Sequence, residues 1–128
     1  MKTILVDAIH CFVIKDEGIN KSLQKMLDKY KNKKIILTGA NDEEMEKFDL
    51  DKMPYEVFTM KHDPDKTDPK YYEMFLSKFN LKAEDVVYFE HDEKAAETAR
   101  SIGIKTHVYE AEKKDLIALE VFFDIYLD

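Results

Sequence analysis

Cysteine is almost absent from this sequence of 128 residues, and glycine and proline are scarce. Its single cysteine, Cys11, excludes an intramolecular disulfide framework and favours a cytoplasmic location. Only three Gly and three Pro, with 45% apolar residues, exclude the fibrous and disordered classes. The longest apolar run near the N-terminus, residues 4–6, is too short for a signal peptide or a membrane span.

A basic stripe is also missing. The formal net charge is −7, and the 20 Lys and Arg are interleaved with 27 Asp and Glu. An acidic surface disfavours nonspecific binding to nucleic acid and attachment to anionic membranes, so we expect neither partner. The length is that of one domain with one core, and we expect a single domain over residues 1–128.

Short apolar runs rich in β-branched residues alternate with stretches of helical periodicity. The runs predict buried strands at 3–6, 33–39, 55–60, 85–90 and 106–110. The periodic stretches predict helices at about 20–30, 41–48, 69–79, 93–103 and 115–127. This alternation implies an α/β fold: a three-layer α/β/α, Rossmann-like sandwich around a central parallel sheet of about five strands.

Several local signals support these boundaries. Asn20 is suited to an N-cap, Pro69 to a first helical turn and Gly103 to the end of a helix. The last predicted helix, at 115–127, carries more apolar residues than one face needs. We expect its apolar surplus to pack in the core, with a subunit interface in a homo-oligomer as the alternative.

Polar side chains follow the carboxyl ends of the predicted strands. In open parallel sheets these ends border the crevice in which ligands bind. There a carboxylate can attack phosphorus, a hydroxyl and a lysine can hold phosphoryl oxygens, and further acids can hold Mg²⁺. The residues placed at this edge are Asp7, Thr38, His62, Lys66, Glu90, His91 and Asp92.

The order of these motifs resembles that of the haloacid dehalogenase (HAD) superfamily. Most of the similarity lies in KTDPKYYEMFLSKFNLKAEDVVYFEHDEKAAETARSIGIKTHVY at 66–109, which is similar to the family's lysine motif running through to its fourth motif. The resemblance spans nearly the whole chain and implies a HAD-like hydrolase of the phosphatase type. It makes Asp7 the nucleophile, Thr38 the phosphate-binding hydroxyl and Lys66 the charge-balancing lysine.

The catalytic motifs nevertheless depart from the family pattern. The usual DxDGT is replaced by DAIHC, which puts Ile9 where the phosphatases have their general acid. The acid of the fourth motif that binds Mg²⁺ aligns with His91, and a later acid aligns with Ala95. Glu90 and Asp92 flank the gap, so the metal ligands implied by the resemblance are Asp7, Glu90 and Asp92, with weak affinity for Mg²⁺.

The spacing of the motifs leaves no room for a cap domain. Thirty residues separate Asp7 from Thr38, and about twenty-seven separate Thr38 from Lys66. Family members without a cap domain resemble enzymes of two kinds. In one kind the open site accepts macromolecular substrates, and in the other an oligomer partner supplies the cap. We therefore expect a phosphorylated small molecule or macromolecule as the ligand.

Two functions are consistent with this sequence. In the first, the protein is a hydrolase with an altered site, since dehalogenases and phosphonatases in the family also lack the second Asp. In the second, it is a pseudoenzyme that keeps the fold as a binding or interaction module. The three edge histidines, His10, His62 and His91, together with Cys11, suggest a transition-metal site as a minor alternative. The more common explanation, which we expect here, is that the histidines lie exposed in loops and that Cys11 is a small buried residue of the core.

Overall fold

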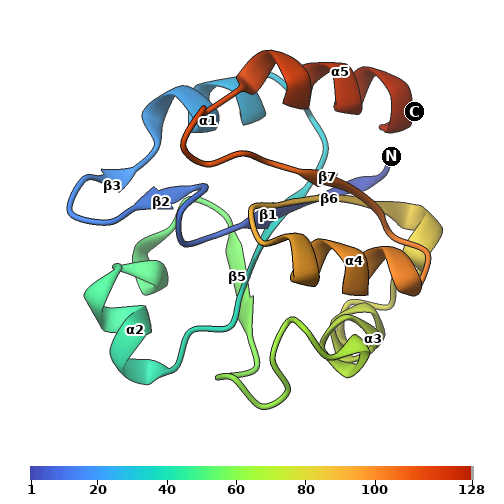
Figure 1. Ribbon diagram of the computed structural model, residues 1–128, viewed down its shortest axis with the longest axis horizontal. Coiled ribbons are helices and arrows are strands. Elements are labelled where there is room, and N and C mark those ends of the chain that lie inside the picture. Colours follow the sequence, from blue (N-terminus) through green and yellow to red (C-terminus); the bar gives the residue numbers. More distant parts are fainter. Residues whose placement is uncertain (128) are drawn as a thin grey trace.

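The computed structural model describes residues 1–127, and a five-stranded parallel sheet forms its centre (Figure 1). The strand order is β5-β4-β1-β6-β7, and every neighbouring pair is parallel. The five strands are β1 (Thr3–Asp7), β4 (Lys34–Thr38), β5 (Glu56–Thr59), β6 (Val86–Glu90) and β7 (Lys105–Val108). A small antiparallel hairpin of β2 (Val13–Ile14) and β3 (Gly18–Ile19) follows β1. The predicted parallel sheet is confirmed.

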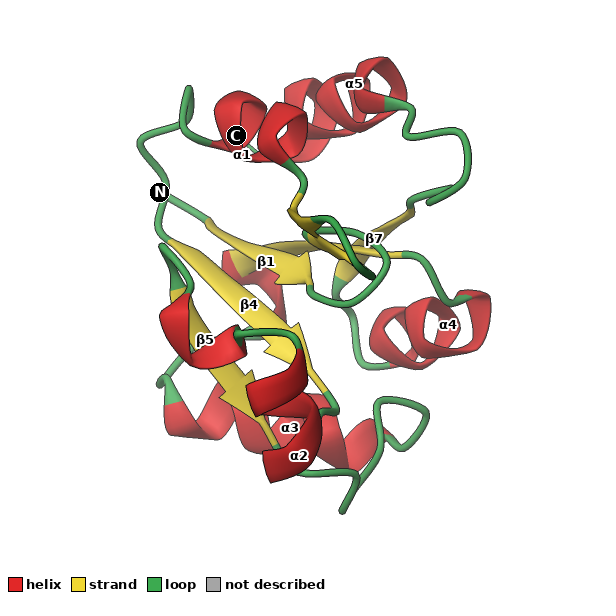
Figure 2. Ribbon diagram, turned by 90° about the vertical axis from the view of Figure 1, so that its left-hand side faces the viewer, coloured by secondary structure: helices red, strands yellow, loops and turns green. Residues whose placement is uncertain are grey.

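Helices cover both faces of this sheet. They are α1 (Lys21–Leu27), α2 (Asp42–Lys47), α3 (Pro69–Lys78), α4 (Glu93–Ser101) and α5 (Leu116–Tyr126), with short 3₁₀ turns η1 (Leu50–Lys52) and η2 (Ala83–Asp85). Helices α1 and α5 lie on one face, and α3 and α4 lie on the other (Figures 1 and 2). Because strand side chains alternate, Ile4 and Val6 join the core under α1 and α5, while Leu5 joins the core under α3 and α4. The three-layer α/β/α architecture is therefore confirmed.

The direction in which strands are added reverses at β1. From β1 the chain adds β4 and β5 on one side of the sheet and then β6 and β7 on the other. Such a reversal opens a crevice beyond the carboxyl ends of the two central strands. Strand β1 ends in Asp7 and β6 ends in Glu90, so the fold itself brings these two carboxylates together.

Local capping explains where the helices begin and end. The Asn20 side chain accepts a hydrogen bond from the Leu23 backbone N–H at 3.2 Å, as an N-cap does. Helix α1 ends at Leu27, earlier than predicted, because the backbone N–H groups of Lys29 and Tyr30 form tighter i→i−3 bonds. Helix α4 ends at Ser101, and Gly103 follows with a φ of +93° that favours glycine.

The apolar residues of α5 divide between two environments. Leu119, Phe122 and Phe123 are buried against α1 and the sheet. Ile117, Val121 and Ile125 are exposed by 76%, 51% and 62% and lie four residues apart along the helix. We expect core packing to explain the many apolar residues of this last helix, but it accounts for only one face of α5. Among the described residues, α5 included, no helix has the length and apolar character needed to span a bilayer.

This division predicts unequal effects of two substitutions within α5. Phe123 is 1% exposed, so Phe123→Ala should lower the free energy of unfolding by about 3–5 kcal/mol through lost burial and a residual cavity. Val121→Ala on the exposed side should change it by at most about 0.5 kcal/mol. Urea denaturation of both variants measures the difference. Similar losses in the two variants would contradict the assignment of the α5 faces.

Candidate active site

A pocket of about 280 Å³ opens at the carboxyl edge of the sheet. The seven residues that the sequence places at or after the strand ends line it: Asp7, Thr38, His62, Lys66, Glu90, His91 and Asp92. Its lining does not include His10 or Cys11, the other two residues expected at this edge. Ile9 and Ala95, which replace two acids of the family pattern, line it as well. The predicted convergence of these side chains on one edge is confirmed, whereas their roles depend on the contacts described next.

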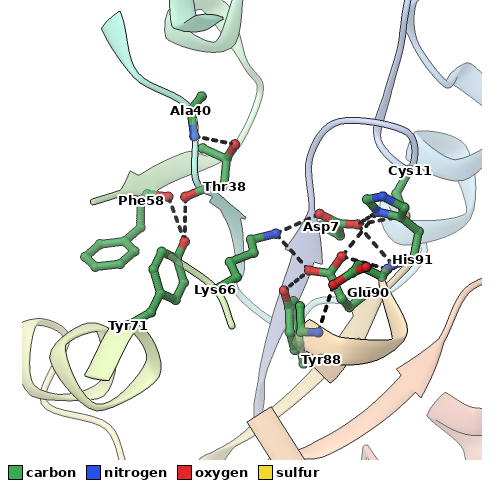
Figure 3. A network of polar contacts seen from close by, with 12 residues as sticks. Asp7, Cys11, Thr38, Ala40, Phe58, Lys66, Tyr71, Tyr88, Glu90 and His91 are labelled. Atoms are coloured by element: carbon green, nitrogen blue, oxygen red, sulfur yellow. Dashed lines mark hydrogen bonds and ion pairs between the residues drawn. The ribbon is translucent and has the colours of Figure 1, made fainter. Parts of the chain in front are cut away.

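Asp7 is almost completely buried, and both of its carboxylate oxygens accept hydrogen bonds (Figure 3). Oδ1 accepts from the Lys66 ammonium at 2.8 Å. Oδ2 accepts from the backbone N–H of His91 at 3.1 Å, from its ring Nδ1 at 2.5 Å, and from the Cys11 thiol at 3.2 Å. Asp7, the nucleophile that the resemblance implies, is thus held by three other residues.

Lys66 joins the two strand-end carboxylates. Its Nζ is 2.8 Å from Asp7 Oδ1 and 2.8 Å from Glu90 Oε1, and the side chain is 14% exposed. It belongs to the loop that precedes α3 and reaches the site from beside the Tyr88 ring, whose centroid is 5.9 Å from Nζ. The lysine therefore bridges a pair of acids rather than pairing with one.

Glu90 is 1% exposed and uses both oxygens within the chain. Oε1 accepts from Lys66 and from the Tyr88 hydroxyl. Oε2 accepts from the Asp92 backbone N–H at 3.0 Å and forms an ion pair with His91 Nδ1 at 3.2 Å. The sequence does not predict that Tyr88 donates a hydrogen bond to Glu90, because its pattern indicates only that Tyr88 belongs to a buried strand.

His91 differs most from its expected role. The sequence predicts an exposed loop histidine, but the side chain is only 31% exposed and its Nδ1 lies between Asp7 Oδ2 and Glu90 Oε2. The ring also meets the His10 ring edge-on, with 5.0 Å between centroids. Asp7 and His91 are 84 residues apart, so no local pattern announces this contact.

These contacts shift the pKa values of Asp7, Lys66 and His91. Burial alone raises the pKa of Asp7, but Lys66 and His91 outweigh burial and hold that pKa well below its usual range. Burial likewise opposes the charge of Lys66, yet Asp7 and Glu90 raise its pKa well above the ordinary value. Hydrogen bonds with Asp7 and Glu90 raise the pKa of His91 to about 10, so its ring is a cation at neutral pH.

Thr38 lines the pocket without joining this ionic group. Its hydroxyl oxygen accepts from the Ala40 backbone N–H at 3.2 Å, and its carbonyl accepts from the Tyr71 hydroxyl at 2.7 Å. Within residues 1–127, no hydrogen bond connects the Thr38 side chain with Asp7 or Lys66. Tyr71 thus fixes the end of β4 from α3, a positioning role that the sequence does not reveal.

Asp92, one of the expected metal ligands, instead caps a helix. Its Oδ2 accepts from the Ala95 backbone N–H at 2.9 Å, at the start of α4. Asp7 Oδ2 accepts from three donors and Glu90 Oε1 from two, and Lys66 or His91 lies against each of the four carboxylate oxygens. Oxygen atoms that ligate Mg²⁺ must present lone pairs to it. This arrangement of donors therefore does not fit the Mg²⁺ site that the resemblance implies.

Within residues 1–127, the transition-metal alternative reduces to one group of candidate ligands. Ligand atoms of Asp7, Cys11 and His91 lie within 4.8 Å of one another. Burial and the nearby Asp7 raise the pKa of the Cys11 thiol, which disfavours the thiolate that metals bind. Cys11 is fully buried, as expected of a small filler, and donates its S–H to Asp7.

His62 belongs to a separate ion pair at the rim of the pocket. Its Nε2 is 2.6 Å from Glu44 Oε1, and its Nδ1 is 3.0 Å from Asp65 Oδ1. The hydrogen bond with Glu44 raises the pKa of His62. The side chain is half-exposed, so this contact connects α2 with the Lys66 loop and stays apart from Asp7.

Sequence comparison finds no matching family model and no matching curated protein. Solved structures are more informative. A HAD family enzyme from Bacteroides thetaiotaomicron, in complex with magnesium and inorganic phosphate, matches with a TM-score of 0.71 at 11% identity, over 87% of this chain and 95% of that chain. An uncharacterised protein from Corynebacterium glutamicum matches with 0.64 at 11% identity, over 97% and 96%. The core domain of a candidate phosphoglycolate phosphatase from Streptococcus pneumoniae matches with 0.61 at 13% identity, over 96% and 95%. The chain therefore has the HAD-like fold.

The ion pair between His91 and Asp7 predicts an unusual titration. An NMR pH titration should place the midpoint of the His91 ring near 10, against an ordinary value of 6.5. Because the folded pKa exceeds the unfolded one, the protonated ring contributes its full stabilisation below pH 6.5 and loses it as pH rises through 10. The stability difference between wild type and His91→Asn should therefore shrink over that interval. The Asp7→Asn variant is the control and should lower the midpoint, and a wild-type midpoint near 6.5 would refute the ion pair.

Proposed function

We propose that this protein is a HAD-like binding module whose pocket holds a phosphorylated ligand and does not hydrolyse it by the Mg²⁺-dependent route. The observation that carries this proposal is the state of Asp7, whose two oxygens both accept hydrogen bonds from other residues. A nucleophilic carboxylate must direct a lone pair at the reacting atom. The donors on Asp7 stabilise its resting state and oppose that attack.

The residues around Asp7 support the same conclusion. Ile9 lines the pocket two residues after Asp7, and an aliphatic side chain has no proton to give a leaving group. His91 and Ala95 take the places of two family acids, so the pocket lacks the carboxylates that would hold a metal against a phosphate. Ile9 thus weakens protonation, His91 and Ala95 weaken metal binding, and the donors on Asp7 weaken nucleophilic attack.

Donors that remain for a ligand favour an oxygen-rich anion. An ammonium has three N–H donors, and Lys66 uses two of them on Asp7 and Glu90. The Thr38 hydroxyl accepts from Ala40, which leaves its O–H as a donor toward the pocket. The volume of about 280 Å³ suits a small group, such as the phosphoryl of a small molecule or of a modified macromolecule.

We also propose that no cap domain covers this pocket. Between Asp7 and Lys66 the described elements are the β2–β3 hairpin, two short helices, one 3₁₀ turn and two strands of the main sheet. Helix α2, whose Glu44 lines the pocket, has six residues. An open pocket of this kind admits a phosphorylated macromolecule as well as a small molecule.

A second candidate is a metal-independent hydrolase with an altered site. It is favoured by the convergence of Asp7, Thr38 and Lys66 on one pocket. Reactions whose leaving group needs no proton do not require an acid at Ile9. Wild-type turnover in EDTA that disappears in Asp7→Asn would establish this candidate in place of the binding module.

The binding module predicts no turnover that depends on Mg²⁺. With p-nitrophenyl phosphate as the probe and 10 mM MgCl₂, the wild-type rate should equal that of the Asp7→Asn variant. The physical reason is that the donors on Asp7 and the missing acid remove contributions that are each worth orders of magnitude in rate. A wild-type rate stimulated by Mg²⁺ and abolished by Asp7→Asn would contradict the proposal.

It also predicts that inorganic phosphate binds in the presence of EDTA. In a ³¹P NMR titration, Thr38→Val should weaken binding by about 2- to 10-fold, the loss expected for one neutral hydrogen bond. Thr106→Val, at a threonine of β7 that is buried as Thr38 is but does not line this pocket, is the matched control and should leave binding unchanged. Absence of phosphate binding by the folded wild type would refute the proposed ligand.

A further inference from the structure

Two carboxylates and two cations alternate around the centre of the pocket. Lys66 Nζ bridges Asp7 Oδ1 and Glu90 Oε1, each at 2.8 Å. His91 Nδ1 bridges the other two oxygens, Asp7 Oδ2 at 2.5 Å and Glu90 Oε2 at 3.2 Å. Figure 3 shows Lys66 and His91 reaching the carboxylate pair from different sides. Each carboxylate therefore contacts Lys66 through one oxygen and His91 through the other.

Charge requires this pairing. Asp7 and Glu90 are 2% and 1% exposed, and two adjacent buried carboxylates repel each other and lose hydration. Lys66 supplies one positive charge from the loop before α3. The second comes from His91, the residue that directly follows β6 and replaces the family's metal-binding acid. The four charges then sum to zero without any ion from solution.

The geometry also leaves no place for a metal between these atoms. Two ligand atoms at right angles around Mg²⁺ stand about 2.9 Å apart, because each lies about 2.0–2.1 Å from the ion. Asp7 Oδ2 and His91 Nδ1 are 2.5 Å apart, the separation of a short hydrogen bond. A nitrogen that donates its proton to a carboxylate has no lone pair for a cation.

We infer that His91 is a built-in replacement for the divalent cation, and that one substitution, His91→Asp, converts this pocket into a Mg²⁺ site. The substitution removes a positive charge and adds a carboxylate beside Asp7 and Glu90. Three acids would then face Lys66 alone, which leaves two uncompensated negative charges. A divalent cation matches that deficit. The inference deepens the proposed function, on which its account of a metal-free pocket rests.

The experiment compares three substitutions at one position. His91→Asp adds a negative charge, His91→Asn is its neutral isostere, and His91→Lys restores a positive charge. Mg²⁺ binding is measured by calorimetry and by the shift of the thermal unfolding midpoint in 10 mM MgCl₂. We expect His91→Asp to bind Mg²⁺ at least about tenfold more tightly than wild type, since carboxylate ligands set the affinity of such sites. His91→Asn and His91→Lys should show no such gain, and His91→Lys should be the more stable of these two in EDTA.

Two measurements cover the case in which His91→Asp does not fold without metal. Refolding that variant in 10 mM MgCl₂ should restore the native NMR spectrum, and failure to fold with or without Mg²⁺ counts against the inference. In the wild type, Mn²⁺ should not selectively broaden the amide resonances of Asp7 and His91. Selective broadening there, or a folded His91→Asp variant that binds Mg²⁺ no better than wild type, would overturn it.

These outcomes are separate from a failure of the proposed function. Wild-type turnover in EDTA would refute the binding module and leave the role of His91 intact, because that reaction needs no metal. Conversely, a His91→Asp variant without Mg²⁺ affinity would refute the inference that His91 replaces a divalent cation. The same result would leave the absence of Mg²⁺-dependent turnover in the wild type untouched.

Discussion

Two acids that the fold forces together determine most of what is distinctive in this protein. Asp7 and Glu90 end the two central strands of the sheet, at the point where the strand order reverses, and both are buried. A parallel sheet cannot move them apart without changing its register. The chain must therefore supply positive charge at this edge, and Lys66 and His91 do so.

The same pairing restricts the chemistry. Hydrogen bonds that stabilise a buried carboxylate lower its basicity, and a group held in this way attacks poorly. Interactions that make Asp7 a secure structural acid thus work against its use as a nucleophile. Lys66 serves both purposes, since it balances the acids and retains a donor for a ligand oxygen. The contacts that stabilise the ionic group thus reduce the reactivity of Asp7, and this conflict is the physical basis of the proposed binding role.

The likeness to solved structures shows how little sequence the fold requires. At 11–13% identity the sheet and its helices superpose over most of the chain, because alternation of buried strands and amphipathic helices suffices to specify the layers. Function follows the site and not the fold. In our proposal a single position after β6, acid in the family pattern and His91 here, separates a pocket that binds Mg²⁺ from one that does not.

The sequence by itself determined the layers, the strand order along the chain and the edge at which Asp7, Thr38 and Lys66 meet. These follow from short-range signals: apolar runs such as residues 3–6, the cap at Asn20, and the rule that parallel strands end on one side. Only the tertiary structure decided which partner each polar group takes. The Asp92 carboxylate caps its own helix, and His91 turns from the solvent toward Asp7, 84 residues away. Pairings of this kind depend on distances between strands, and a linear pattern of residues does not contain those distances.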